Sequence, residues 1–214
     1  MAEYVVHGAA GSGSVAVEAA LTLIGAPYSV KKPAGRTPPF GGRYTPVGQV
    51  PGLVTPTGEL ITESAAILIW LAETHPEARL APLAGEPERA AFLRWMSFVS
   101  ANIYAHYWAR DFPVRVVDSK LGQKQVKARL EARIAACWGV MEAGLGPTGP
   151  YLLGEDLTVL DIYVTVVGRW TPRKALHEII APGIAAVIRR IESEPRLAEV
   201  WAKRFPLRSA SPGA

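Results

Sequence analysis

The stretch GQVPGLVTPTGELITESAAILIWLAE, from Gly48 to Glu73, decides the fold of this chain. Two short apolar runs flank the turn sequence TPTGE, in which Pro56 presets its own φ and Gly58 can adopt a positive φ. The runs Gly52–Thr55 and Leu60–Thr62 are therefore predicted to pair as an antiparallel hairpin. The segment that follows, ESAAILIWLAETH, has a helical pattern and stops at a proline. The stretch as a whole predicts a β-β-α unit.

The N-terminal stretch YVVHGAAGSGSVAVEAAL, residues 4–21, predicts a companion unit. A β-branched run at Tyr4–His7 meets a loop rich in glycine and serine, and a helical pattern follows over Val15–Ile24. Gly25 ends this helix. The next apolar run, Tyr28–Lys32, is predicted to lie parallel to the first strand because a helical crossover joins them. The front of the chain therefore reads as β-α-β, an irregular loop, and β-β-α.

The glycine-rich loop GAAGSG, residues 8–13, also suggests a nucleotide site, which the rest of the sequence disfavours. A dinucleotide fold needs an acidic residue about 20 residues beyond the loop to hold the ribose. Here the second predicted strand ends in SVKKP, which contains no acid. The Gly-Lys-Ser/Thr sequence of a phosphate-binding loop is missing from the chain as well. We therefore expect the loop to serve a different ligand.

Composition narrows the class of protein. The 214 residues carry a net charge of +4 in scattered basic residues, which suits an anionic small ligand or nucleic acid and decides neither. Cys137 is the single cysteine, so an intrachain disulfide is excluded, and its helical surroundings predict a buried thiol. The sequence contains no His/Cys cluster with zinc spacing, no apolar run that could cross a membrane, and no signal-peptide pattern. We expect a cytoplasmic protein without a metal.

The remainder of the chain has helical periodicity. Apolar side chains recur at three- and four-residue steps in three stripes, which predict packed core faces. These stripes are Phe92, Trp95, Met96, Val99 and Ile103; Val126, Leu130, Ile134, Trp138 and Met141; and Ile184, Val187, Ile188 and Ile191. In GEDLTVLDIYV, Thr158 and Asp161 have the spacing of a capping box with Asp in place of Glu, which predicts a helix start. The segment EARLAPLAGEPER, between the two halves, is typical of a linker.

The stretch Gly48–Glu73 closely resembles the thioredoxin-like half of cytosolic glutathione transferases. In that family a Val-Pro pair with a cis bond precedes the hairpin, and Glu-Ser opens the next helix; here these pairs are Val50-Pro51 and Glu63-Ser64. EDLTVLDIYV resembles the capping box of the family, and GRWTPRKALHEIIAPGIAAVIRRIESEPRLAEV resembles the end of its bacterial members. The resemblance covers nearly the whole chain and is greatest to the bacterial beta-like group.

This resemblance implies an α/β plus all-α fold. A thioredoxin-like βαβ-ββα domain would span residues 1–78, a linker 79–87, and an all-helical domain with the acceptor-substrate pocket 88–214. It also implies a homodimer that uses glutathione as co-substrate and hydrophobic electrophiles as second substrate, without nucleic acid or membrane as partner. Conjugation is the implied activity, with peroxide reduction as a side activity. The alternatives are a non-catalytic binding or regulatory protein and a glutathione-dependent isomerase or dehalogenase.

Each end of glutathione has candidate contacts under this resemblance. Val50, followed by Pro51, would pair with the cysteinyl backbone like an added strand. Ser64 lies at a predicted helix N-terminus, which favours the γ-glutamyl carboxylate. Glu63 can take the ligand ammonium group, although Glu63 and Ser64 would also serve as simple helix caps. For the glycine end the candidates are Gln49, Arg36 and Arg43.

The glutathione thiol must ionise to become a nucleophile, and a hydroxyl donor at a helix N-terminus favours the thiolate. Ser12 and Ser14 are equal candidates for this donor, a backbone N–H is a third, and Ser14 also suits the N-cap of the first helix. The cysteine of the beta-like group falls at Gly13, so that mechanism is absent here. A tyrosine near the end of the first strand is absent as well, since Tyr4 stands at its start. His7 is expected to serve packing or to support the residues beside the site.

The electrophile is expected to lie between the glycine-rich loop and the helical domain. The segment NIYAHYWARDF supplies aromatic residues at helical spacing, and GRWTPR supplies a tryptophan and an arginine. Several aromatic residues on one helix are more often core than site, but the resemblance implies that this helix borders the acceptor pocket. The candidates are Tyr104, Tyr107, Trp108, Trp170 and Arg173.

Overall fold

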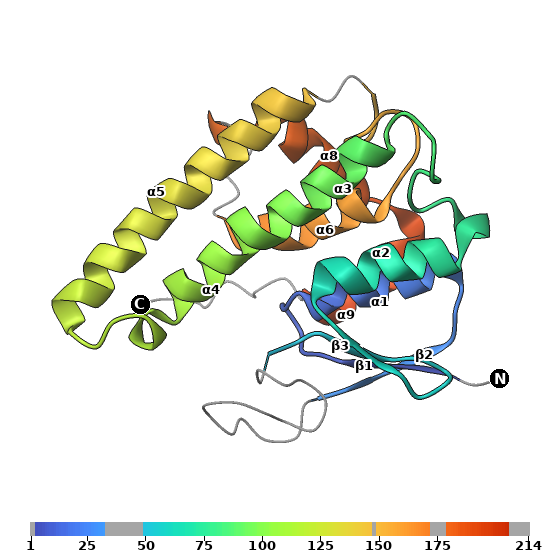
Figure 1. Cartoon of the computed structure of the whole chain (residues 1–214), viewed down its shortest axis with the longest axis horizontal. Helices are drawn as coiled ribbons and strands as arrows, with labels where there is room; N and C mark the ends of the chain where they lie inside the picture. The colour runs from blue at the N-terminus through green and yellow to red at the C-terminus, as the bar shows by residue number, and fades with distance from the viewer. Residues whose placement is uncertain (1–2, 33–48, 147–148, 172–178, 206–214) are drawn as a thin grey trace. The chain divides into compact units, whose positions relative to one another are not determined.

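A computed structural model describes residues 3–32, 49–146, 149–171 and 179–205 of the chain (Figure 1). The chain divides by its internal contacts into two compact units. The first combines residues up to Ala78 with those from Ile191 onward, and the second runs from Arg79 to Arg190. Residues 191–205, which the expected boundaries assign to the helical domain, thus group with the N-terminal strands.

A four-stranded mixed sheet organises the first unit (Figure 1). Its strands, in the spatial order β2-β1-β3-β4, are β1 Tyr4–His7, β2 Tyr28–Lys31, β3 Gly52–Val54 and β4 Leu60–Thr62. Strand β1 runs parallel to β2 and antiparallel to β3, and β3 pairs antiparallel with β4. The predicted crossover and hairpin are both confirmed, with Gly58 at a φ of +89° in the hairpin turn.

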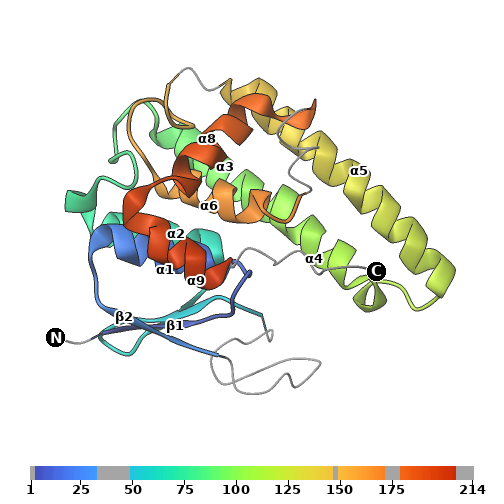
Figure 2. The ribbon, with the colours of Figure 1, turned by 180° about the vertical axis from the view of Figure 1, so that it is seen from behind.

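Three α-helices lie on one face of this sheet: α1 Ser14–Ile24, α2 Ser64–Thr74 and α9 Ala198–Arg204 (Figures 1 and 2). Helix α1 is buried from Ser14 to Leu21, because it contacts both α2 and α9. As predicted, Gly25 ends α1 with a φ of +77°, and its N–H donates to the Thr22 carbonyl at 3.1 Å. The short 3₁₀ helices of this unit are η1 Pro76–Ala78 and η5 Pro195–Leu197.

The described part of the second unit is helical, apart from an isolated bridge between Tyr151 and Gly154. Its helices are α3 Arg89–Phe98, α4 Ala105–Asp111, η3 Pro113–Arg115, α5 Lys120–Leu145, α6 Val159–Gly168 and α8 Pro182–Glu192, the last two residues of which group with the first unit. The first predicted stripe is fully buried, whereas Val126 and Leu130 of the second are half-buried. The observed architecture confirms the predicted fold class.

A π-helical turn, η2 Val99–Tyr104, joins α3 to α4 without a break. The sequence pattern predicted a regular helix through this region, because apolar residues at three- and four-residue steps do not reveal one extra residue in a turn. Turns of this kind occur frequently at functional sites. Here the turn sets the register of α4, the helix on which Tyr107 and Trp108 lie.

Helix α6 begins at the predicted capping box. The Thr158 N–H and hydroxyl both donate to Asp161 Oδ2 at 2.8 Å, and the Leu152 N–H donates to Asp161 Oδ1 at 2.8 Å. Burial raises the pKa of Asp161 to about 6, although these hydrogen bonds favour the ionised form. The three hydrogen bonds tie the Asp161 side chain to Leu152 and to the start of α6.

Thr158→Ala removes one donor to this carboxylate and leaves the backbone unchanged. We expect the free energy of unfolding to fall by about 1 kcal/mol, because a buried carboxylate loses a hydrogen bond. Urea denaturation followed by circular dichroism measures the change. Thr158→Ser keeps the hydroxyl and serves as the control; an equal loss in both variants would assign the effect to the methyl group instead.

Candidate functional site

The register of the sheet brings three separate segments to one edge of the first unit. His7, at the end of β1, lies opposite Gly52 at the start of β3, and Gly52 lies opposite Thr62 at the end of β4. The loop after β1, the segment before β3 and the residues after β4 therefore meet at the same end of these strands. They contain the residues predicted to hold glutathione and its thiol, with the exception of Arg36 and Arg43, which lie outside the described residues.

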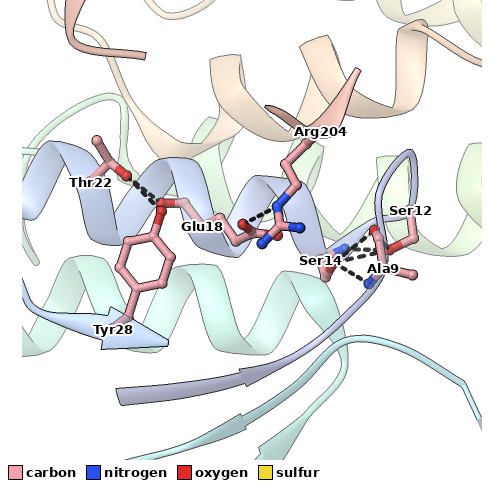
Figure 3. A network of polar contacts seen from close by, with 7 residues as sticks. All are labelled: Ala9, Ser12, Ser14, Glu18, Thr22, Tyr28 and Arg204. Carbon is pink, nitrogen blue, oxygen red and sulfur yellow. Dashed lines mark hydrogen bonds and ion pairs between the residues drawn. The ribbon is translucent and has the colours of Figure 1, made fainter. Parts of the chain in front are cut away.

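The two serines of the loop after β1 form one hydrogen-bonded cluster with Ala9 (Figure 3). The Ala9 N–H donates to Ser14 Oγ at 3.1 Å, and the two serine Oγ atoms lie 2.9 Å apart. Ser14 is the first residue of α1, and the N-cap is Gly13, so the prediction that Ser14 caps this helix is wrong. The physical reason is that its oxygen is engaged by Ala9, which lies behind the helix start in sequence, and not by an N–H of α1.

The two serines differ in how far they are buried. Ser14 has 0% of its surface exposed, whereas Ser12 is half-buried. The Ser12 hydroxyl donates to the Ala9 carbonyl at 2.7 Å, and this carbonyl also accepts the Ser12 N–H at 3.2 Å. Because the carbonyl has a second donor, the Ser12 hydroxyl can turn toward a ligand without leaving a buried acceptor unpaired.

Gly8 makes this compact loop sterically feasible. A Cβ added at Gly8 would overlap with Oγ and Cβ of Ser14. Since both atoms belong to a fully buried residue at the start of α1, the overlap could be relieved only by moving the helix start. The glycine is therefore needed for the approach of the β1 end to α1, in addition to any role beside a ligand.

The segment before β3 contains the predicted cis bond. The Val50–Pro51 peptide is cis, Pro51 is buried, Val50 is half-buried and Gln49 is exposed. This confirms the prediction for the peptide bond that the family resemblance implied.

Glu63 and Ser64 begin the helix that follows β4. Glu63 is the N-cap of α2 but its side chain makes no capping hydrogen bond, and it is exposed. Its φ of +67° is unusual for a residue with a Cβ, and such backbone strain is concentrated at functional sites. Ser64 is buried as the first residue of α2. The observed geometry thus leaves the Glu63 carboxylate available, in contrast to the simple capping role.

The aromatic candidates of the second unit divide into a core residue and half-buried residues. Tyr107 is 2% exposed; its hydroxyl is paired with Thr171 Oγ1 and accepts Trp138 Nε1 at 3.3 Å, and burial raises its pKa to about 12. Tyr104 and Trp108 are half-buried, as is Trp170, whose ring meets that of Tyr104 edge-on at 4.9 Å. Arg173 lies outside the described residues. Tyr107 is therefore a core residue, and its ring packs against that of Trp170.

One buried ion pair of the first unit was not predicted from the sequence. Glu18, on α1, accepts a hydrogen bond from Arg204 Nε of α9 at 2.6 Å (Figure 3), and burial raises the pKa of Glu18 although the arginine lowers it. The signal was a single acid in the otherwise apolar segment VAVEAAL, which α1 buries on all sides. Its partner could not be found from the sequence, because the two residues are 186 positions apart.

The described residues also bear on three other features: a metal site, a reactive cysteine or histidine, and a membrane-spanning helix. Within them, no group of three or more His, Cys, Asp or Glu side chains could hold a metal ion. Cys137 is buried as predicted, and burial raises the pKa of its thiol, which keeps it unreactive. His7 is buried at the end of β1, and burial together with the charge of Lys31 lowers its pKa. None of the described helices is both long enough and apolar enough to span a membrane.

Comparison with known proteins gives consistent matches. Residues 14–74 match the family model described as the glutathione S-transferase N-terminal domain. The chain is 30% identical over 200 residues to YncG, an uncharacterized GST-like protein of Escherichia coli K12, covering 91% of this chain and 95% of that one. A solved glutathione transferase homologue from Sulfitobacter with bound glutathione has a TM-score of 0.83 at 25% identity, over 95% and 99% of the two chains.

The beta-class glutathione S-transferase of Sphingomonas chungbukensis shares the fold, with a TM-score of 0.74 at 24% identity over 95% of this chain and 100% of the other. The sheet order, the cis Val50–Pro51 bond and the helical second unit agree with these matches. Identity of 30% across nearly the full length of both chains shows that this chain belongs to the cytosolic glutathione S-transferase family.

Proposed function

We propose that this chain is a glutathione transferase that adds the glutathione thiolate to hydrophobic electrophiles. The observation that carries the proposal is the sheet register, which gathers the loop after β1, the segment before β3 and the start of α2 at one edge. The bound glutathione in the Sulfitobacter relative supports the same ligand here. The chemistry requires binding of an anionic tripeptide, ionisation of its thiol and exclusion of water from the reacting pair.

The γ-glutamyl end is proposed to bind at the start of α2. The first N–H groups of a helix lack partners inside the helix and favour a carboxylate, and Ser64 stands at that position. The exposed Glu63 carboxylate next to it is proposed to take the ligand ammonium group. Ser64 would thus bind the negative carboxylate of the γ-glutamyl end, and Glu63 its positive ammonium group. These two contacts together would fix the orientation of that end.

The backbone of the ligand is proposed to pair with Val50, which precedes β3 and lies at the edge where the three segments meet. An extended peptide that pairs with an extended protein segment gains main-chain hydrogen bonds without depending on side-chain identity. Pro51 directly after it is buried. Gln49 is exposed beside Val50 and is proposed to contact the glycine end.

The thiolate is proposed to be stabilised by Ser12, together with the Gly13 N–H at the N-terminus of α1. Ser12 is chosen over Ser14 because Ser14 is fully buried, and a hydroxyl without exposed surface cannot contact a ligand sulfur. Ser14 would act through Ser12, by holding the Ala9 peptide and the Ser12 oxygen in place. The positive end of the α1 dipole adds to the stabilisation of the negative sulfur.

The second substrate and the assembly state are proposed on the basis of family membership. Tyr104, Trp108 and Trp170 are the proposed contacts of a hydrophobic electrophile, with Tyr107 as the packing that supports them. Arg173 remains a proposed contact from outside the described residues. A cytoplasmic homodimer is proposed, which light scattering after size-exclusion chromatography would test.

Replacement of Ser12 tests the assignment of the thiol donor. Ser12→Ala is expected to raise the pKa of bound glutathione by about one unit, because the thiolate loses a hydrogen-bond donor. Ultraviolet thiolate absorbance as a function of pH measures this pKa. Ser14→Ala is expected to lower the free energy of unfolding by about 1–2 kcal/mol, since it leaves the Ala9 N–H unpaired. A thiol pKa unchanged by Ser12→Ala would assign stabilisation to the backbone N–H alone.

Replacement of Glu63 tests the γ-glutamyl site. Glu63→Gln is expected to weaken glutathione binding about tenfold, because a charge-assisted hydrogen bond to the ligand ammonium becomes a neutral one. Isothermal titration calorimetry measures the affinity. Glu59→Gln is the matched control, since Glu59 is also exposed but lies in the turn at the opposite end of the hairpin. Equal affinities for both variants would contradict the proposed contact.

A non-catalytic glutathione-binding protein is the second candidate function. It is favoured by the hydrogen bonds that engage both serine hydroxyls with each other and with Ala9, and by a glycine at the position of the beta-type cysteine. Wild-type protein that binds glutathione without lowering its thiol pKa, and that leaves chlorodinitrobenzene unreacted, would favour this candidate. A lowered thiol pKa with conjugate formation would favour the transferase.

A further inference from the structure

The ion pair between Glu18 and Arg204 connects the first helix of the chain with its last described helix. Glu18 is 2% exposed, and the Arg204 side chain is 16% exposed, so both charges are largely removed from water. A buried charged pair is expensive to desolvate and often contributes little net stability. A buried pair of this kind can instead fix a particular arrangement of the chain.

Arg204 makes a second contact, through its backbone. Its carbonyl accepts the Gly11 N–H at 3.0 Å. The carbonyls in the last turn of a helix have no partner inside the helix, so the end of α9 is free to accept a bond from outside. Gly11 has a φ of +72° and would meet nothing with a Cβ, so its backbone conformation and not its size makes glycine suitable. The loop after β1 is thus hydrogen-bonded to the end of α9.

Two anchors therefore hold the loop, one on α1 and one on α9. Ser14 accepts the Ala9 N–H from the α1 side, and Arg204 accepts the Gly11 N–H from the α9 side. Ser12, the proposed thiol donor, directly follows the second anchor. The side chain of Arg204 is in turn fixed by Glu18, one helical turn beyond Ser14 (Figure 3).

We propose that Glu18 and Arg204 are positioning residues, which set the geometry of the loop from Gly8 to Gly13 and thereby aim Ser12 at the glutathione sulfur. The inference rests on the proposed transferase function. Neither residue touches the ligand in this scheme. The carboxylate neutralises the guanidinium beside it, so the pair acts through the position of the Arg204 carbonyl and not through its field at the sulfur.

Arg204→Gln in the full-length chain tests the role in the reaction. The variant is expected to raise the pKa of bound glutathione by about one unit and to lower kcat/KM about tenfold, with KM for glutathione changed less than about threefold. Arg204→Lys, which keeps the charge, should recover part of this loss. Arg196→Gln is the matched control, because Arg196 forms a comparable ion pair with Glu194 at 2.7 Å on the preceding 3₁₀ helix, with 60% of its side chain exposed.

The double variant Glu18→Gln/Arg204→Gln keeps the protein testable if a single variant, with one buried charge unpaired, does not fold. Two amides can form a neutral hydrogen bond, so the double variant should have a thiol pKa closer to wild type than the Arg204→Gln variant. Equal or larger loss in the double variant would overturn the positioning role, because a neutral hydrogen bond between the two side chains would then not restore the geometry of the loop. An unchanged thiol pKa in Arg204→Gln would overturn it as well.

Amide hydrogen exchange at Gly11 separates this inference from the proposed function. Without any ligand, Arg204→Gln should accelerate Gly11 exchange, and Arg196→Gln should leave it unchanged. If wild-type protein does not lower the thiol pKa of glutathione, the transferase proposal fails, whatever the exchange shows. If wild type lowers it and Arg204→Gln changes neither that pKa nor Gly11 exchange, the positioning role fails and the transferase proposal stands.

Discussion

The antiparallel pairing of β3 with β1 on one side and β4 on the other is the constraint on which the candidate site depends. Through Gly52, this register aligns the end of β1 with the end of β4. A slip of one residue would turn every side chain of β3 to the opposite face and would remove Leu53 from the core, where it is fully buried. The relative positions of the glycine-rich loop, Val50-Pro51 and Glu63-Ser64 are therefore tied to the packing of the sheet.

The loop between β1 and α1 is fixed by residues that are not proposed to contact glutathione. Gly8 leaves the space that Ser14 occupies, and Ser14 fixes the peptide of Ala9. Arg204 adds a contact from the far end of the chain. This arrangement suits the proposed thiolate stabilisation, because donors that are already oriented need not reorganise when charge develops on the sulfur.

The strands, the hairpin and the end of α1 were predictable because they depend on neighbouring residues. Turn chemistry at Gly58 and Gly25 and the spacing of Thr158 from Asp161 identify local conformations that few other residues permit. The cis Val50–Pro51 bond was predictable only through the family resemblance. The N-cap at Gly13 and the π-helical turn were missed, since a serine before an apolar run and a regular apolar stripe are typical of more than one geometry.

The sequence by itself determined the order of strands and helices along the chain, the family, and the segments that are proposed to bind glutathione. Only the tertiary structure decided which of two adjacent serines is buried, that Tyr107 belongs to the core, and that Glu18 has Arg204 as its partner. The physical reason is that turns and periodicity are set by residues a few positions apart. Burial and ion pairing depend instead on contacts between helices that are distant in the chain, here α1 with α9, which close packing selects and local pattern does not encode.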